Sequence, residues 1–274
     1  MTIPPVDRSR LSLNQITTEQ WDVDEVIAGC VAAGIGWLGV WRHKVEPFGV
    51  ERAARLLADA GLRVSSLCRG GFFPAPSEAE RRRRLDDNRR AVDEAARLRT
   101  DVLVLVCGPA PDRDIDWARR QIDQGVEELA PYAAERGVRL GIEPLHPMMA
   151  AERSAVVTLA EANRIAARFP AGDVGVVVDA YHVWWDPELY RQIDAAGGRI
   201  VGFHVSDWTV PTTSLLEGRG IMGQGVIELR RLRQAVEKAG YAGPIEVEVI
   251  NRELWQQPGA AVLGDIVEAF VDHL

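Results

Sequence analysis

The sequence has 274 residues, 47% of them hydrophobic and 26% charged, so the chain can bury a large core. Its formal net charge of −8 argues against a nucleic-acid partner, because proteins that bind phosphate backbones usually carry a basic surface. The N-terminus lacks the apolar run of a signal peptide and no segment resembles a membrane span, so we expect a cytoplasmic protein with no membrane partner.

Short apolar runs rich in β-branched residues recur about every thirty residues, as is typical of strands that alternate with helices. Runs such as VLVLV and VGVVV are apolar at successive positions, which indicates parallel strands buried on both faces. The predicted strands are 11–16, 35–40, 62–67, 102–106, 138–143, 174–179, 200–205 and 244–249.

Amphipathic segments between these runs predict helices at 22–33, 50–60, 78–98, 116–136, 158–168, 187–195, 226–239 and 260–272. Several end in a glycine before the next strand, as in ADAGLRV, AERGVRL and EKAGYAG, where glycine permits a left-handed closing residue. The alternation predicts an α/β fold, a single (β/α)8 TIM barrel with residues 1–274 as one domain. An open doubly wound sheet is less favoured because no GxGxxG motif follows the first strand. The glycine-rich segment 208–225 is the one extended loop and predicts a mobile lid.

In such a barrel the active site lies where the strands end and the following loops begin. Four of the five histidines fall at predicted strand ends, whereas chance placement would scatter them over helices and loops. The polar and aromatic residues at these ends are Asn14, Trp41, Arg42, His43, Arg69, Glu143, His146, Asp179, His182, His204, Asp207, Glu246 and Glu248.

Acidic or imidazole groups lie near the ends of the last four strands: Glu143, Asp179, His204, and the pair Glu246 and Glu248. Carboxylates that converge on one rim repel each other and are costly to bury unless they bind a cation. An oxygen-rich set with one nitrogen suits a hard divalent ion, Mn²⁺ or Mg²⁺ before Co²⁺ or Zn²⁺.

Each of these residues also has a simpler interpretation. A single Glu or Asp at a strand end often caps the next helix, and a lone His204 in an apolar strand is more often a core residue than a ligand. A polar contact inside the barrel explains Glu246 equally well. Together on neighbouring strands, however, these residues favour a metal site.

Other residues at this rim are candidates for substrate binding. Trp41 and Trp208 could stack on the C–H faces of a sugar, although packing into the wall is the more common role of any one tryptophan. Arg69 and Arg219 have forked donors suited to a hydroxyl, carboxylate or phosphate, but surface salt bridges explain either one about as well.

Five motifs, GIEPLHP, VVVDAYH, FHVSDW, GRGIMGQGVIEL and GYAGPIEVEVIN, resemble in order and spacing those of the sugar phosphate isomerase/epimerase family of xylose-isomerase-like TIM barrels. The resemblance extends over nearly the whole chain, and it implies one Mn²⁺-type ion held by Glu143, Asp179, His204 and Glu248 rather than Glu246. It also implies that His182 contacts the substrate, with His146 a weaker candidate and Asp207 just behind the site. His43 completes the candidate substrate-binding set.

The same resemblance implies chemistry in carbohydrate metabolism. The metal chelates the carbonyl and hydroxyl oxygens of a ketose and stabilises an enediolate, while Glu143 and Glu248 act as the acid/base pair of an isomerase or epimerase. A metal-dependent lyase or dehydratase on a keto-sugar or keto-glycoside is the main alternative. A nuclease like the apurinic-site endonucleases and a non-catalytic sugar-binding subunit are less favoured. We expect an unphosphorylated small-molecule sugar as substrate and, from the family, a homo-oligomer.

Overall fold

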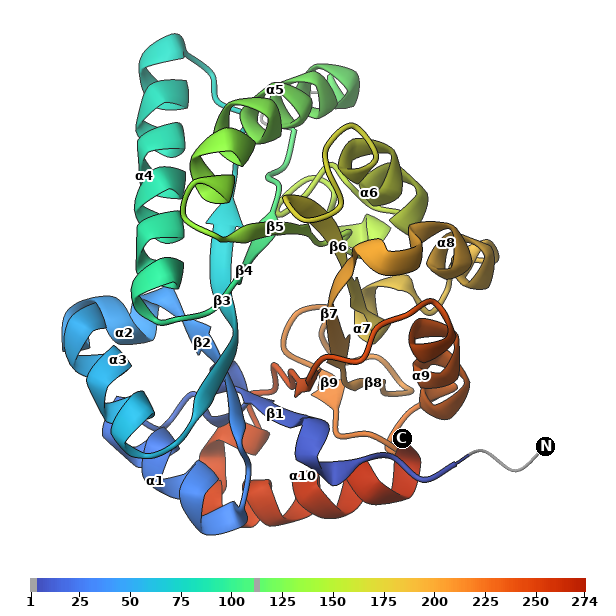
Figure 1. The fold of residues 1–274 in the computed structure, drawn as a ribbon. Helices are drawn as coiled ribbons and strands as arrows, with labels where there is room; N and C mark the ends of the chain where they lie inside the picture. Colours follow the sequence, from blue (N-terminus) through green and yellow to red (C-terminus); the bar gives the residue numbers. More distant parts are fainter. Residues whose placement is uncertain (1–3, 111–113) are drawn as a thin grey trace.

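Eight parallel strands close into a barrel in the computed structural model, which describes residues 4–110 and 114–274 (Figure 1). Neighbouring strands follow the chain order, and β1 closes the barrel by pairing with both β2 and β10. The predicted (β/α)8 barrel is therefore confirmed. The barrel strands are β1 (Leu11–Asn14), β2 (Trp37–Trp41), β3 (Arg63–Gly71), β4 (Val102–Val106), β5 (Arg139–Ile142), β6 (Val174–Asp179), β7 (Ile200–Val205) and β10 (Ile245–Val247).

Helices surround the barrel on its outer side (Figure 1). They are α1 (Val23–Ala33), α2 (Arg42–Phe48), α3 (Val50–Asp59), α4 (Glu78–Arg97), α5 (Ile115–Ala134), α6 (Leu159–Ala166), α7 (Ala180–Val183), α8 (Leu189–Ala196), α9 (Leu229–Lys238) and α10 (Gly259–His273). Short 3₁₀ helices cover Arg8–Arg10, Gln15–Thr18, Pro147–Met149, Gly197–Arg199 and Leu254–Gln256. None of the helices within the described residues is long and apolar enough to cross a membrane.

Local sequence signals set the helix ends. Asp22 accepts the backbone N–H of Glu25 at 2.9 Å, and the Glu25 side chain accepts the backbone N–H of Asp22, which closes a capping box at the start of α1. The three glycines predicted to close helices, Gly61, Gly137 and Gly240, have positive φ angles of 72°, 67° and 101°.

Apolar side chains fill the inside of the barrel as well as the layer between strands and helices. Val102, Val104, Val177 and Val201 form an inner cluster with Cys68, while a larger cluster joins the outer strand faces to the helices. Strands β4 and β6 are consequently buried at every position, as their continuous apolar runs predict. Because this part of the interior is packed with apolar side chains, the ends of the barrel are where a site for a ligand can form.

The structure departs from the predicted elements in three places that shape the rim. Helix α7, a four-residue helix directly after β6, was not predicted. Helix α2 was not predicted, since it is short, contains Pro47 and buries only Val45. The segment predicted as one open loop contains two short strands, β8 (Asp207–Trp208) and β9 (Arg219–Gly220), which pair antiparallel and anchor both of its ends. The mobile-lid prediction therefore applies only to the stretch between these strands.

Candidate metal centre and substrate cavity

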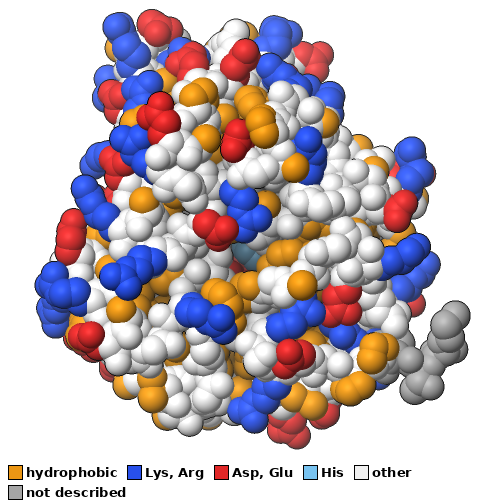
Figure 2. Space-filling model, viewed as in Figure 1, with side chains coloured by type: hydrophobic (Ala, Val, Ile, Leu, Met, Phe, Trp, Pro, Cys, Tyr) orange, Lys and Arg blue, Asp and Glu red, His pale blue; other side chains and the backbone are white. Residues whose placement is uncertain are grey.

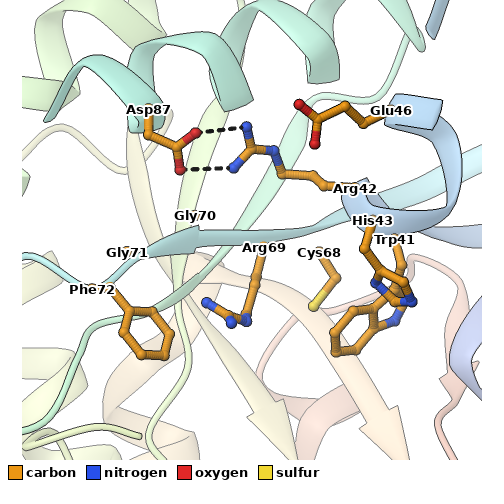
Figure 3. Close-up of a pocket in the computed structure, with 10 residues that line it drawn as sticks. All are labelled: Trp41, Arg42, His43, Glu46, Cys68, Arg69, Gly70, Gly71, Phe72 and Asp87. Atoms are coloured by element: carbon orange, nitrogen blue, oxygen red, sulfur yellow. Dashed lines mark hydrogen bonds and ion pairs between the residues drawn. The ribbon is translucent and has the colours of Figure 1, made fainter. Parts of the chain in front are cut away.

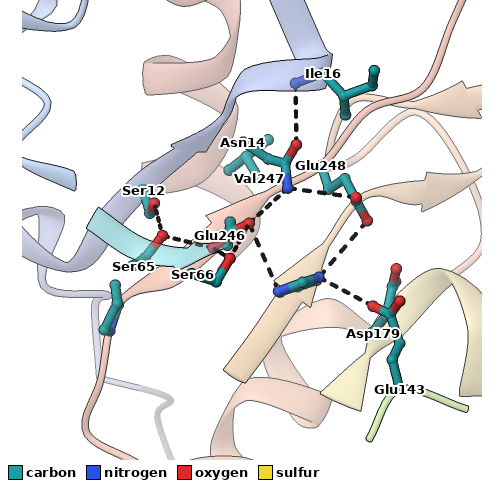
Figure 4. Close-up of polar contacts among 12 residues, drawn as sticks. Ser12, Asn14, Ile16, Ser65, Ser66, Glu143, Asp179, Glu246, Val247 and Glu248 are labelled. Atoms are coloured by element: carbon teal, nitrogen blue, oxygen red, sulfur yellow. Dashed lines mark hydrogen bonds and ion pairs between the residues drawn. The ribbon is translucent and has the colours of Figure 1, made fainter. Parts of the chain in front are cut away.

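Four potential metal ligands meet at one end of the barrel because they come from four neighbouring strands. Glu143 follows β5, Asp179 ends β6, His204 lies in β7 and Glu248 follows β10. One ligand atom of each lies within 4.8 Å of the others, and all four side chains are buried (Figure 4). The structure thus brings together the four residues that the sequence predicts as ligands.

The chemistry of this cluster fits a bound cation. Burial raises the pKa of Glu143 to about 7, and the nearby carboxylates of Glu248 and Asp179 add to the rise. Glu143 Oε1 and His204 Nδ1 lie 3.3 Å apart, and each is buried without a hydrogen-bond partner among the described residues. Unpartnered buried acceptors are costly, and a divalent ion would satisfy both atoms and offset the carboxylate repulsion.

Arg219 supplies a positive charge within the same cluster. Its Nη1 lies 3.0 Å from Asp179 Oδ2 and 3.0 Å from Glu248 Oε2. Burial would raise the pKa of Asp179, but the Arg219 guanidinium lowers it to about 2. The side chain of Arg219 is only 2% exposed, so its counter-ions are the carboxylates of this cluster rather than surface groups.

Glu246, for which the sequence allows either a metal-ligand role or a polar contact inside the barrel, lies behind His204. Its carboxylate accepts hydrogen bonds from Asn14 Nδ2 at 2.6 Å, Ser65 Oγ at 2.6 Å and Ser66 Oγ at 3.0 Å (Figure 4). It also lies 3.7 Å from His204 Nε2, whereas His204 Nδ1 faces Glu143. Burial alone would lower the pKa of His204, but Glu246 and Glu143 hold it well above its ordinary value. A carboxylate on the far nitrogen is a common way to orient a metal-bound histidine.

His182 lies between the cluster and the following loop. Its Nδ1 accepts the backbone N–H of His146 at 3.2 Å, and its Nε2 lies 3.0 Å from Arg219 Nη2. Burial lowers the pKa of His182 to about 3, so the imidazole is neutral at physiological pH. A neutral histidine at this place adds no charge to the wall of the cavity beside the cluster.

A cavity opens directly onto these residues. Its wall includes Trp41, Arg69 and His182 beside the ligands Glu143 and Glu248. In Figure 2 a narrow opening lies near the middle of the molecule, with a histidine at its floor. A wider cavity of 390 Å³ adjoins it through Trp41, Cys68 and Arg69, and His43 lies in the wall of that outer cavity (Figure 3). Sequence-predicted substrate residues therefore line both cavities.

The remaining predicted residues lie outside the inner cavity. Trp208 stacks on Tyr181 with ring centres 4.7 Å apart, and His146 lies 5.0 Å from Trp208, so these rings form an aromatic wall on the loop side. Asp207 accepts the backbone N–H groups of Gly223 at 2.9 Å and Ile227 at 3.0 Å. The structure therefore gives Asp207 a role in shaping its loop and does not bring it to the substrate cavity.

Two features of the site have no clear signal in the sequence. Arg153 lines the inner cavity, although it comes from an irregular segment after β5 that shows no motif. Ser65 and Ser66 lie in the middle of β3 and reach Glu246 only because the barrel closes.

The fold and this cluster define a class of barrel protein with a buried carboxylate and histidine centre. The family model described as "Xylose isomerase-like TIM barrel" matches residues 28–269, and the chain belongs to this family.

Several known proteins resemble the chain. The crystal structure of protein SMc04130 from Sinorhizobium meliloti 1021 is 43% identical, covers 97% of this chain and 99% of its own, and superposes with a TM-score of 0.94. A 3-dehydroshikimate dehydratase of Pseudomonas aeruginosa is 29% identical over 83% of this chain. The matched region covers only 36% of the length of that enzyme. The L-ribulose-5-phosphate 3-epimerase UlaE of Escherichia coli is 26% identical over 75% of the chain and 71% of the epimerase.

Proposed function

We propose that the protein is a divalent-metal-dependent isomerase or epimerase that acts on a ketose or keto-sugar, with Glu143 and Glu248 as its acid/base pair. The observation that carries this proposal is that both glutamates line the same cavity while their carboxylates belong to the ligand cluster. A substrate that reaches the ligand cluster therefore lies against two carboxylates at once. The similarity to a ribulose-phosphate 3-epimerase supports the same reaction class.

When bound, the metal would act as a Lewis acid that polarises the substrate carbonyl. One glutamate would remove the proton from the carbon beside the carbonyl to give an enediolate, and the other would return a proton at another face or carbon. His182 would hydrogen-bond a substrate oxygen, and the buried surroundings of the cluster would exclude water from the reacting carbon.

The donor set supports Mn²⁺ as the resident ion, with Mg²⁺, Co²⁺ and Zn²⁺ as alternatives. Three carboxylates and one imidazole form a mixed, oxygen-rich set that the harder divalent ions prefer. Purification without chelators followed by elemental analysis would identify the ion, and activity restored to chelated protein would rank the four metals.

Proton NMR in D₂O on Mg²⁺-loaded protein tests the reaction, since Mg²⁺ avoids paramagnetic broadening. The panel would contain free ketoses, ketose phosphates, hydroxypyruvate, inososes, 3-keto-glycosides and 3-dehydroshikimate. Deuterium that enters beside a carbonyl as an isomer forms would support the proposal. Glu143→Gln should stop this exchange, and Glu46→Gln, which removes a carboxyl from the outer cavity only, should not. Absence of exchange with every compound, in protein that binds the metal, would contradict the proposal.

A lyase or dehydratase is the second candidate, favoured by the similarity to a 3-dehydroshikimate dehydratase. It would use the same proton abstraction, but the electron pair would expel a leaving group two carbons from the carbonyl. Loss of water or of an alcohol in the NMR experiment would identify this activity in place of isomerisation.

A further inference from the structure

Two arginines in the inner cavity have no counter-ion among the described residues. Arg69 and Arg153 both line the cavity that holds Glu143, Glu248 and His182. Within residues 4–110 and 114–274, neither guanidinium group lies within 4.0 Å of a carboxylate oxygen or donates a hydrogen bond. They therefore differ from the other arginines around the site.

The neighbouring Arg42 shows the contrast. It donates two hydrogen bonds to Asp87 at 3.0 and 3.1 Å and another to Glu94 at 2.6 Å, so its charge is balanced. Arg69 has no such partner, and its pKa is lowered by burial and by the positive charges of Arg153 and Arg42. A partly buried cation that faces other cations is costly, and a bound anion would remove that cost.

The surrounding structure holds the side chain of Arg69 and the backbone of Arg153. The Arg69 guanidinium lies 4.2 Å from the centre of the Phe72 ring, and the backbone N–H of Phe72 is bound to Val106 O at 2.9 Å (Figure 3). The backbone N–H of Arg153 donates to Met149 O at 2.8 Å. The contact with Phe72 preorganises the Arg69 cation beside the ligand cluster and reduces the entropy lost on binding.

The charge balance of the cavity leads to the same conclusion. The three ligand carboxylates would be neutralised by a divalent ion together with Arg219, which already contacts two of them. The buried carboxylate of Glu246, 3.7 Å from His204 Nε2, adds one further negative charge. Arg69 and Arg153 together exceed it by one positive charge, in the space that a substrate would fill. We infer that the substrate carries an oxyanion, either a carboxylate or a phosphate, which Arg69 and Arg153 bind. This inference rests on the proposed function and narrows its substrate class to acidic keto-sugars.

Isothermal titration of the Mg²⁺-loaded protein with three matched polyols tests the inference. Ribitol is neutral, ribonate adds a carboxylate, and ribitol 5-phosphate adds a phosphate. At least one of the two anions should bind about tenfold or more tightly than ribitol, because charged hydrogen bonds are stronger than neutral ones. The anion that binds more tightly identifies which oxyanion the site accepts.

Variants connect the binding to the two arginines. Arg69→Gln and Arg153→Gln should each weaken binding of the preferred anion about tenfold or more, a much larger loss than either variant shows for ribitol or Mg²⁺. Arg69→Lys should lose less, because it keeps the charge but not the forked donors. Arg82→Gln removes an exposed charge from α4 and should have no effect.

Three results would overturn the inference: ribitol binding as tightly as both anions, wild-type anion affinity in both Gln variants, or no anion binding to protein that binds Mg²⁺. Failure here is distinct from failure of the proposed function. Arginine-dependent anion binding without proton exchange would reject the isomerase alone, whereas exchange on neutral ketoses without anion binding would reject the oxyanion site alone.

Discussion

Gly39 in β2 gives a sharp test of how Glu246 supports the metal centre. A Cβ atom at position 39 would lie 2.1 Å from Glu246 Oε1 and 2.4 Å from its Cδ. Ordinary contact begins near 3.4 Å, so Gly39→Ala would require the oxygen to retreat by about 1.3 Å, from 2.1 to 3.4 Å. The carboxylate is buried and bound to Asn14, Ser65 and Ser66, so it cannot move without breaking hydrogen bonds.

The expected effects are on both stability and metal affinity. Overpacking of this kind costs about 1–3 kcal/mol in the free energy of unfolding. Displacement of the group that orients a metal-bound histidine typically lowers metal affinity by about 10–100-fold. His204 should therefore bind the ion less well in Gly39→Ala, although position 39 contacts no metal ligand directly.

Titration with Mn²⁺ and thermal unfolding of the metal-free protein would measure the two effects separately. Gly36→Ala is the matched control, because a Cβ there meets no atom within 4 Å. Glu246→Gln removes the charge with little change in volume and should lower metal affinity without the overpacking. A Gly39→Ala protein that binds Mn²⁺ within about twofold of wild type would refute this account of Glu246.

Three further predictions follow from the site. Glu143→Gln and Glu248→Gln should each reduce turnover below about a tenth of wild type while circular dichroism shows a folded protein, and activity above that level would reject the acid/base role of that residue. Burial raises the pKa of Glu143 to about 7, and the pKa of His204 lies well above its ordinary value, so protons compete with the metal for both side chains. The metal-free protein should therefore lose stability as pH rises through about 7. The gain in melting temperature on adding Mn²⁺ should grow from about pH 5.5 to about pH 8. A gain that does not change with pH would contradict these pKa shifts. Tyr181→Phe removes the hydrogen bond from Tyr181 Oη to Leu215 O at 3.0 Å and should lower the free energy of unfolding by about 0.5–1.5 kcal/mol. The loop between β8 and β9 should also be cleaved faster by proteases. Unchanged cleavage there would show that this hydrogen bond does not hold the loop.

The barrel could be predicted from the sequence because its signals are local. Buried parallel strands need continuous apolar runs, and the structure places β4, β6 and β7 over the predicted residues. Helix α2 was missed because a seven-residue helix with one buried side chain leaves almost no periodic pattern.

The candidate ligands were also accessible from the sequence, since the fold brings the ends of adjacent parallel strands to one rim. Once the strands were assigned, Glu143, Asp179 and His204 had to lie near each other. For the choice between Glu246 and Glu248, family resemblance was needed, and the structure explains the difference by their depth. Glu248 lies beyond the end of β10 at the cluster, whereas Glu246 lies within the strand against the serines of β3.

The order of the elements and the polar residues that end them can be predicted from the amino-acid sequence alone, because both depend on neighbours along the chain. The pairing of the charges depends on the closed barrel. Arg42, Arg69 and Arg219 are the same residue type near the same rim, yet Arg42 meets Asp87 and Glu94 from α4, Arg219 meets the metal ligands, and Arg69 faces an open cavity. Closure of the barrel brings Asp87 within 3.0 Å of Arg42 and Asp179 within 3.0 Å of Arg219, although each pair is tens of residues apart in sequence. The distance to a carboxylate decides whether an arginine forms an ion pair within the protein or is available to bind a ligand.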